Sequence, residues 1–286
     1  MLVYCVVNSA ILALTALGFN LTFGISGVAN FAYGAIYIGS GFLAWTFMNK
    51  LHLPYLVSAA LTVLLVGLAG TLLYKLVLKR VRGLTISEVI ATFGIGLVIL
   101  ELLRYIGFIG FRYSLPPIVK GSVEIFDSYV EIQRILIIVV GAALLFVLYL
   151  FTRRTRVGRA FRGIAQEEHT SLSLGINPDN IASYSMGLGS ALGALSSIAI
   201  LPLGTITVDG GYDVLINALS VCIVGGLGST FGVIIASFII GFAQTLTAVY
   251  FSPHWVMIVS LFAILFILAV RPSGLLGHQK ELEERV

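Results

Sequence analysis

Long apolar stretches alternate with short polar segments along the whole chain. Most of them approach the roughly 20 residues that an α-helix needs to cross the hydrocarbon core of a bilayer. The pattern predicts an all-α integral membrane protein, a polytopic bundle of about eight or nine transmembrane or re-entrant helices in one domain over residues 1–286. The stretches cover residues 2–23, 27–48, 53–78, 86–110, 132–152, 181–203, 213–228, 230–250 and 255–270.

Three of these stretches carry further information about how they begin or cross the membrane. The segment 213–228 is short and rich in small residues, so a full crossing and a re-entrant hairpin both stay open. Thr85 and Glu88 have the spacing of a capping box before an apolar run, which predicts a helix start at residue 85 and a structural role for Glu88. The apolar N-terminus has no Lys or Arg before Lys50, unlike a cleaved secretory signal, so we expect an uncleaved first span.

The composition supports a lipid environment. The chain is 58% hydrophobic and 10% charged, whereas a soluble domain carries about 25% charged residues. So few charges cannot cover a water-facing surface, and the apolar side chains must therefore face lipid. The net charge is +4, but the basic residues cluster in a few short loops, where topology explains them better than nucleic-acid binding does.

The basic clusters also set an orientation. They follow the third, fifth and last apolar stretches, and all fall on one side if every stretch crosses the membrane. Because cytoplasmic loops carry an excess of Lys and Arg, we expect a multi-pass protein with its N-terminus outside and its C-terminus inside. The residues are Lys79, Arg80 and Arg82; Arg153, Arg154, Arg156, Arg159 and Arg162; and Arg271, Lys280 and Arg285.

No catalytic constellation is present. The sequence has no HExxH, GxSxG or P-loop motif, so we expect a chain that is not an enzyme, does not itself hydrolyse ATP and holds no cofactor. Cys5 and Cys222 are far apart and form no CxxC pair, so we expect no metal site. Glu101 and Arg104 lie at i, i+3 in an apolar stretch, where they are either a structural ion pair or part of a pathway.

Two regions, 19–41 and 209–232, mix glycines and polar residues at membrane depth. Interrupted helices are tolerated there only where they are buried in protein or line a cavity. Paired interruptions in the two halves of a chain indicate a substrate path, although glycine-mediated packing explains them equally well. The candidate path residues are Asn30, Phe31, Tyr33, Gly34, Asn217, Gly225 and Gly226.

The loop over about 153–180 is long for a chain whose other turns are tight. It begins strongly basic and continues as RAFRGIAQEE, a predicted amphipathic helix with Phe161, Ile164 and Ala165 on one side. An apolar face outside the membrane must cover something: lipid headgroups, the chain's own bundle, or a partner protein.

Three motifs carry a resemblance to a known family. They are VANFAYGAIYIGS at 28–40, VGRAFRGIAQEEHTSLSLGIN at 157–177 and AVRPSGLLG at 269–277. In order and spacing the sequence resembles the permease subunits of ABC importers of the branched-chain amino acid type, and more closely the first of the two paired permeases. Tyr33 and Ala35 stand where the family usually has His and Glu. Both lie in the presumed path, so these departures bear on which substrate the chain moves. Gly163 and Ser171 replace the usual Ala and should leave docking intact.

This resemblance implies a subunit that moves branched-chain or related amino acids inward across the cytoplasmic membrane of a prokaryote. It implies as partners a second homologous permease, two cytoplasmic ATPases that bind ATP and Mg, and an extracytoplasmic solute-binding protein. It also implies that the 157–177 segment is a coupling helix that docks on an ATPase, which would cover its apolar face. The implied coupling residues are Arg156, Gly158, Arg159, Ala160, Arg162, Ala165, Glu168 and Gly175.

Two other functions compete with this one. A stand-alone channel or secondary carrier, for a small polar solute such as urea or an amide, would give flux without ATP. An integral membrane enzyme would need a polar cluster at the membrane surface. The adjacent residues Glu167, Glu168 and His169 point in different directions on a helix, so they make a poor site.

Overall fold

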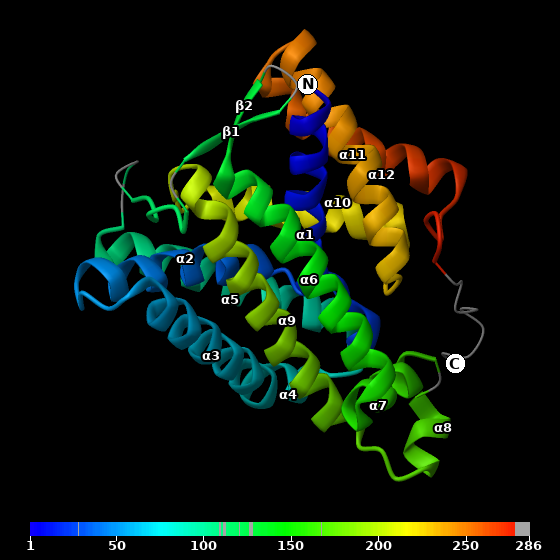
Figure 1. Ribbon diagram of the computed structural model, residues 1–286. Coiled ribbons are helices and arrows are strands. Elements are labelled where there is room, and N and C mark those ends of the chain that lie inside the picture. Colours follow the sequence, from blue (N-terminus) through cyan, green and yellow to red (C-terminus); the bar gives the residue numbers. More distant parts are fainter. Residues whose placement is uncertain are drawn as a thin grey trace.

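The computed structural model describes residues 1–27, 29–108, 110, 113–119, 121–125, 128–166 and 168–277. Lys280 and Arg285 of the predicted basic tail, and Glu167 of the predicted amphipathic segment, lie outside the described residues. Helices make up most of this part of the chain (Figure 1). The larger helices are α1 (Leu2–Ser26), α2 (Tyr33–Asn49), α3 (Tyr55–Leu73), α5 (Thr85–Ile106), α6 (Ile132–Arg154), α7 (Arg156–Gln166), α9 (Pro178–Ile200), α10 (Gly210–Gly225), α11 (Thr230–Tyr250) and α12 (Val256–Val270).

Short elements connect them. A π-helical turn and α4 extend α3, α8 follows α7, and 3-10 turns flank α9 and α12. A small antiparallel hairpin lies between α5 and α6, with Ser122 opposite Glu131. These elements are η1 (Tyr74–Leu78), α4 (Lys79–Val81), β1 (Ser122–Ile125), β2 (Ser128–Glu131), α8 (Glu168–Ser173), η2 (Leu201–Leu203) and η3 (Pro253–Trp255).

The structure confirms an all-α polytopic membrane protein. Among the described residues, seven helical segments are long and apolar enough to cross a bilayer: α1, α3 through α4, α5, α6, α9 with η2, α11, and η3 with α12. Each of the nine predicted stretches contains one helix. The other two, α2 and α10, have only 17 and 16 residues.

Both short helices differ from their predicted bounds. The prediction of a span from residue 27 is wrong because α1 ends at Ser26, where Gly27 takes a left-handed conformation (φ 70°), and α2 begins only at Tyr33. Helix α10 begins at Gly210 instead of residue 213. Its 16 residues make it about 24 Å long, shorter than the roughly 30 Å hydrocarbon core.

The predicted start of α5 at Thr85 is confirmed, but the capping box is wrong. The N-cap residue is Leu84, so the reciprocal Thr–Glu pattern does not form. The Glu88 carboxylate instead accepts a hydrogen bond from the Gly83 N–H at 2.8 Å. Glu88 therefore has a structural role, as predicted.

Helices α1 and α9 form the centre of the bundle. Helix α1 packs on α9, α11, α10 and α6, and α9 also packs on α3 and α2. Small residues allow this contact: a Cβ at Gly189 would lie 2.7 Å from the Gly18 carbonyl oxygen, and one at Gly193 would lie 3.1 Å from the Tyr33 ring. The Gly189–Gly193 pair is thus used for packing inside the chain. Helices α7 and α8 lie at the end of the bundle opposite the N-terminus (Figure 1).

Candidate functional site

The two interrupted regions meet each other near the middle of the bundle. A Cβ on Gly34, in the first turn of α2, would overlap the carbonyl oxygen of Gly211, in the first turn of α10. A Cβ on Gly24 would lie 3.1 Å from Gly228 Cα, so the end of α1 also touches the α10–α11 turn. Two helix N-termini, each with a partial positive charge, therefore begin side by side.

The polar groups of the first interruption are satisfied within the chain. The Asn30 side-chain oxygen accepts from the Ala32 N–H at 3.1 Å, and its amide nitrogen donates to Met186 Sδ at 3.4 Å. The Phe31 N–H donates to Thr92 Oγ1 of α5 at 3.3 Å. These bonds satisfy polar groups of the non-helical backbone between α1 and α2, as a break buried in protein requires.

Tyr33 and Gly34 lie in close packing. Tyr33 is 1% exposed, and its hydroxyl donates to the Thr15 carbonyl at 2.7 Å. Its ring meets that of Phe19 edge to face, with centroids 5.8 Å apart. The tyrosine side chain is thus inserted between α1 and α9, away from solvent, while the neighbouring Gly34 allows the contact with α10.

A crevice lies directly beside this junction. It is lined from the first interruption by Phe31 and Ala35, and from α5 and α10 by a set that sequence reasoning missed: Phe93, Gly96, Leu97, Leu100, Gly211, Tyr212 and Leu215. Its cavity volume of about 10 Å³ is too small for any solute, so this conformation is closed there. In the sequence, only Gly96 could have indicated that α5 contributes to this crevice. A Cβ on Gly96 would lie 3.2 Å from Ala32 Cα, so a small residue is needed where α5 meets the first interruption.

Charged side chains lie on α5 and at the start of α10, the elements that also line the crevice. Arg104 of α5 pairs with Glu101 one turn earlier, as the structural alternative requires, and also with Asp209 at the start of α10. Asp213, on the next turn of α10, is exposed. The link to Asp209 joins two segments 105 residues apart, and no local sequence pattern predicts it.

The residues of the second interruption hold α10 to its neighbours. The Asn217 side-chain oxygen accepts from Gln244 Nε2 of α11 at 3.1 Å and from Ser260 Oγ of α12 at 2.9 Å. A Cβ on Gly225 would overlap the backbone of Gly232. Gly226 has a φ of 97° and touches the backbone of the C-terminal segment at Gly277. The predicted path residues of this half thus lie at helix contacts.

The amphipathic helix predicted after α6 is confirmed as α7. Thr155 precedes it, and its hydroxyl accepts from the Gly158 N–H at 2.9 Å, as an N-cap does. The turn from α6 is so tight that a Cβ on Gly158 would lie 2.6 Å from Thr152 Cα. Gly158 is therefore required by the turn itself.

The apolar face of α7 is covered by the chain's own bundle. Phe161 and Ile164 are 2% and 3% exposed and belong to a cluster with residues of α1 and α6. The Phe161 and Phe151 rings lie edge to face, 5.8 Å apart. The expectation that an ATPase covers this face is wrong, because packing against α1 and α6 already buries it.

The opposite face of α7 is basic and accessible. Arg156, Arg159 and Arg162 are exposed at three-residue spacing, while Ala160 and Ala165 are half-buried. Glu168 begins α8. Gly175 is exposed, with a φ of 79°, in the turn that follows α8. Among the predicted coupling residues whose side chains are described, a partner would therefore meet the arginines first.

Side chains that could bind a metal ion are scattered over the described residues. Within them, no three His, Cys, Asp or Glu side chains gather closely enough to hold a metal ion. Cys5 and Cys222 are both buried free thiols. The Cys222 thiol donates to the Ala16 carbonyl at 3.6 Å, which is ordinary packing between α10 and α1.

Comparison with known proteins assigns the chain to a family. The family model of the branched-chain amino acid transport system permease component matches residues 1–268. The chain belongs to this family. It is therefore a multi-pass membrane component of a transport system and not an enzyme.

Several relatives of this permease match over nearly their full length. The high-affinity branched-chain amino acid transport system permease protein BraD of Pseudomonas aeruginosa is 28% identical over 281 residues, covering 93% of this chain and 91% of BraD. The corresponding LivH protein of Escherichia coli K12 is 26% identical, covering 93% and 91%. A probable LivH of Methanocaldococcus jannaschii is 26% identical, covering 95% and 90%.

A solved structure shares the fold of this permease. PsaBC from Streptococcus pneumoniae, in complex with Fab, aligns with a TM-score of 0.54 over 94% of this chain and 91% of that chain, at 12% sequence identity. At this identity the likeness concerns the fold alone.

Asp179, in the first turn of α9 after the α7–α8 segment, is linked by polar contacts to the start of α5. The side-chain oxygen of Asn177 caps α9, accepting from the Asp179 N–H at 3.0 Å. The Asp179 carboxylate pairs with Arg82 and, at 3.5 Å, with Lys79, both beyond the end of α3. Arg82 directly precedes Gly83, whose N–H binds Glu88 of α5. A continuous set of polar contacts thus runs from the loop after α8 to the helix that lines the crevice.

Proposed function

We propose that this permease is the transmembrane subunit of an ATP-driven ABC importer that moves branched-chain or related amino acids inward across the cytoplasmic membrane of a prokaryote. The family match over residues 1–268, in a chain without a nucleotide-binding motif, carries the proposal. Two separate ATPase subunits bind ATP with Mg and hydrolyse it. A second homologous permease completes the path, and an extracytoplasmic binding protein delivers the solute. The N-terminus lies outside and the C-terminus inside.

The electrostatics of α7 support its use as the coupling helix. Arg156, Arg159 and Arg162 offer three exposed cations on a helix that the bundle holds rigidly through Phe161 and Ile164. An ATPase groove with acidic side chains would complement this face. Because the apolar face is fixed to α1 and α6, a movement of α7 would be passed to the bundle.

The crevice beside the α2–α10 junction supports a path shared by two permeases. Phe93 and Leu97 line the closed crevice and are exposed on the surface of α5, where a second permease would contact them. The elements that line the crevice also carry charges of both signs, on Arg104 and on Asp209 and Asp213, as do the carboxylate and ammonium of an amino acid. Solute selection itself is assigned to the binding protein.

The test is uptake of radiolabelled leucine, isoleucine and valine into proteoliposomes that contain the permease pair, the ATPases, the binding protein and ATP. The decisive variant is Arg159→Glu with Arg162→Glu, which reverses the exposed charge without touching the buried face. Its control is Arg271→Glu, an exposed arginine after α12. We expect uptake to need ATP, to collapse in the double variant together with ATPase attachment, and to persist in the control.

Uptake by this chain alone, without ATP, would replace the proposal with a stand-alone channel or carrier. Competition by urea or an amide, with no competition among the three amino acids, would keep the ATP-driven mechanism and discard the substrate.

A further inference from the structure

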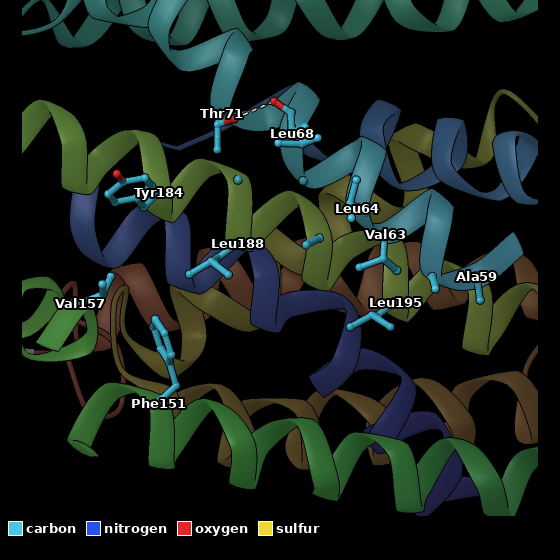
Figure 2. A pocket seen from close by; sticks show the side chains of 14 residues that line it. Ala59, Val63, Leu64, Leu68, Thr71, Phe151, Val157, Tyr184, Leu188 and Leu195 are labelled. Atoms are coloured by element: carbon cyan, nitrogen blue, oxygen red, sulfur yellow. Dashed lines mark hydrogen bonds between the residues drawn. The ribbon is translucent and has the colours of Figure 1, made fainter. Parts of the chain in front are cut away.

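A long apolar groove lies between α3 and α9, and the corner between α6 and α7 closes one end (Figure 2). Its volume of about 870 Å³ falls within the roughly 300–1,000 Å³ that small-molecule sites occupy. The walls are aliphatic or aromatic, apart from the hydroxyls of Thr71 and Tyr184, and the Thr71 hydroxyl already donates to the Leu68 carbonyl at 2.7 Å. The groove therefore suits an apolar occupant.

The groove has the length of one lipid leaflet. Figure 2 shows Ala59 and Leu195 at one end and Thr71, Tyr184 and Val157 at the other. Along α3, the twelve helical steps from Ala59 to Thr71 correspond to about 18 Å at 1.5 Å per residue. Half of a 30 Å hydrocarbon core is about 15 Å. An acyl chain that starts at the Thr71 end would reach the membrane midplane within the groove.

Positive charge is concentrated at the Thr71 end of the groove. Lys75 lies one turn beyond Thr71 on the same helix segment, and Arg154 and Arg156 flank the α6–α7 corner next to Phe151 and Val157. All three basic side chains are exposed, and none forms an ion pair with another described residue. Basic clusters between transmembrane helices at the cytoplasmic surface bind the phosphates of anionic lipids.

We propose that this groove binds one anionic phospholipid. An acyl chain lies along α3 and α9, and the phosphate lies between Lys75, Arg154 and Arg156. The proposal rests on the proposed function for its side of the membrane, since that orientation places the basic end in the cytoplasmic leaflet. The lipid would then border α7 and hold the α6–α7 corner against α3.

Lipid binding can be measured on the purified full-length chain by native mass spectrometry, with added phosphatidylglycerol or phosphatidylcholine. We expect one phosphatidylglycerol to be retained and phosphatidylcholine to bind more weakly. Lys75→Gln with Arg154→Gln and Arg156→Gln should weaken phosphatidylglycerol on the order of a hundredfold, from about 1 kcal/mol per basic residue. Arg271→Gln, at the end of α12, is the matched control and should leave binding unchanged.

A second pair of variants tests the groove itself. Ala60→Trp places an indole in the groove, whereas Ala69→Trp places one on the exposed surface of the same helix outside it. Only Ala60→Trp should displace the lipid. Equal retention in both tryptophan variants, or unchanged retention in the triple glutamine variant, would overturn the proposal.

The occupant in the membrane can be identified with a photo-crosslinking amino acid at Leu64, in the groove wall. A lipid adduct supports the proposal, and an adduct with a second permease or another protein overturns it. The outcome is separable from that of transport. A chain that transports but retains no lipid refutes this inference alone, and one that retains lipid but shows no ATP-driven uptake refutes the proposed function alone.

Discussion

Helices α1 and α6 both cross the bilayer, but they face different surroundings. In the most apolar window of each helix, 61% of α1 is buried inside the chain and 11% of α6. Helix α6 exposes Val139, Phe146 and Val147, whereas α1 buries Ser9 and Thr22, whose hydroxyls bond carbonyls of their own helix. Lipid is as apolar as a leucine side chain, so hydrophobicity cannot hold helices together here. Close backbone contact and satisfied polar groups hold the central helices instead.

The largest effect should come from blocking the α1–α9 contact. In Gly189→Leu the new side chain would meet Thr22 and the Gly18 carbonyl, and backbone cannot move aside as a side chain can. We expect the free energy of unfolding to fall by about 3 kcal/mol or more. Thermal unfolding of the purified chain in detergent measures it.

Gly94→Leu is the matched control, since a Cβ at Gly94 in α5 meets no atom within 4 Å. If both variants unfolded at the same temperature, the central contact would not be what holds the bundle.

The α2–α10 junction should be the next most sensitive point. Gly34→Ala pushes a methyl group into the Gly211 carbonyl, so α2 and α10 must separate. We expect a loss of about 1–3 kcal/mol together with a loss of uptake, because the crevice beside the junction changes shape. Gly39→Ala on the same helix puts its methyl 3.7 Å from Ile99, an ordinary contact, and should retain both stability and uptake. Full uptake by Gly34→Ala would remove the junction from the transport path.

A partly buried hydrogen bond between α1 and the α10–α11 turn should matter less. The side-chain oxygen of Asn20, which is 4% exposed, accepts from the Gly228 N–H at 2.9 Å. Asn20→Ala removes this bond, at an expected cost of about 1 kcal/mol, because the Gly228 N–H lies in an exposed turn. Asn49→Ala removes an exposed bond to the Trp45 carbonyl and should cost much less. Denaturation of the two variants, side by side, measures the difference, and equal losses would contradict the structural role of Asn20.

Most of the fold could be predicted from the sequence because the thickness of the bilayer fixes how long an apolar helix must be. The start of α2 could not, since GVANFA at 27–32 is as apolar as a helix. Its break depends on Asn30 and on Thr92, a partner 61 residues from Phe31. Helix α7 followed from its periodicity, but nothing local says whether its apolar face meets a partner or the chain's own bundle.

The candidate site, too, could be predicted only in part from the sequence. Glycine and asparagine marked the two interruptions, and the structure brings Gly34 against Gly211. That pairing, the contribution of Phe93 and Leu97 from α5, and the Arg104–Asp209 link are all contacts between segments far apart in sequence. Composition can mark residues that break a helix, but only tertiary packing decides which breaks meet.

The smallest effect should be found in the polar network between α10, α11 and α12. Ser260 and Asn217 share a 2.9 Å bond, and Gln244 donates to both, at 2.6 and 3.1 Å. A double-mutant cycle of Asn217→Ala and Ser260→Ala should give a coupling of about 0.6 kcal/mol, typical of hydrogen bonds between membrane helices. The same cycle of Asn217→Ala with Ser58→Ala, whose hydroxyl bonds its own segment at Leu53, should give none. A coupling near zero for the first pair would mean that Gln244 finds replacement partners, and the network would then fix the register of α10 without adding to its stability.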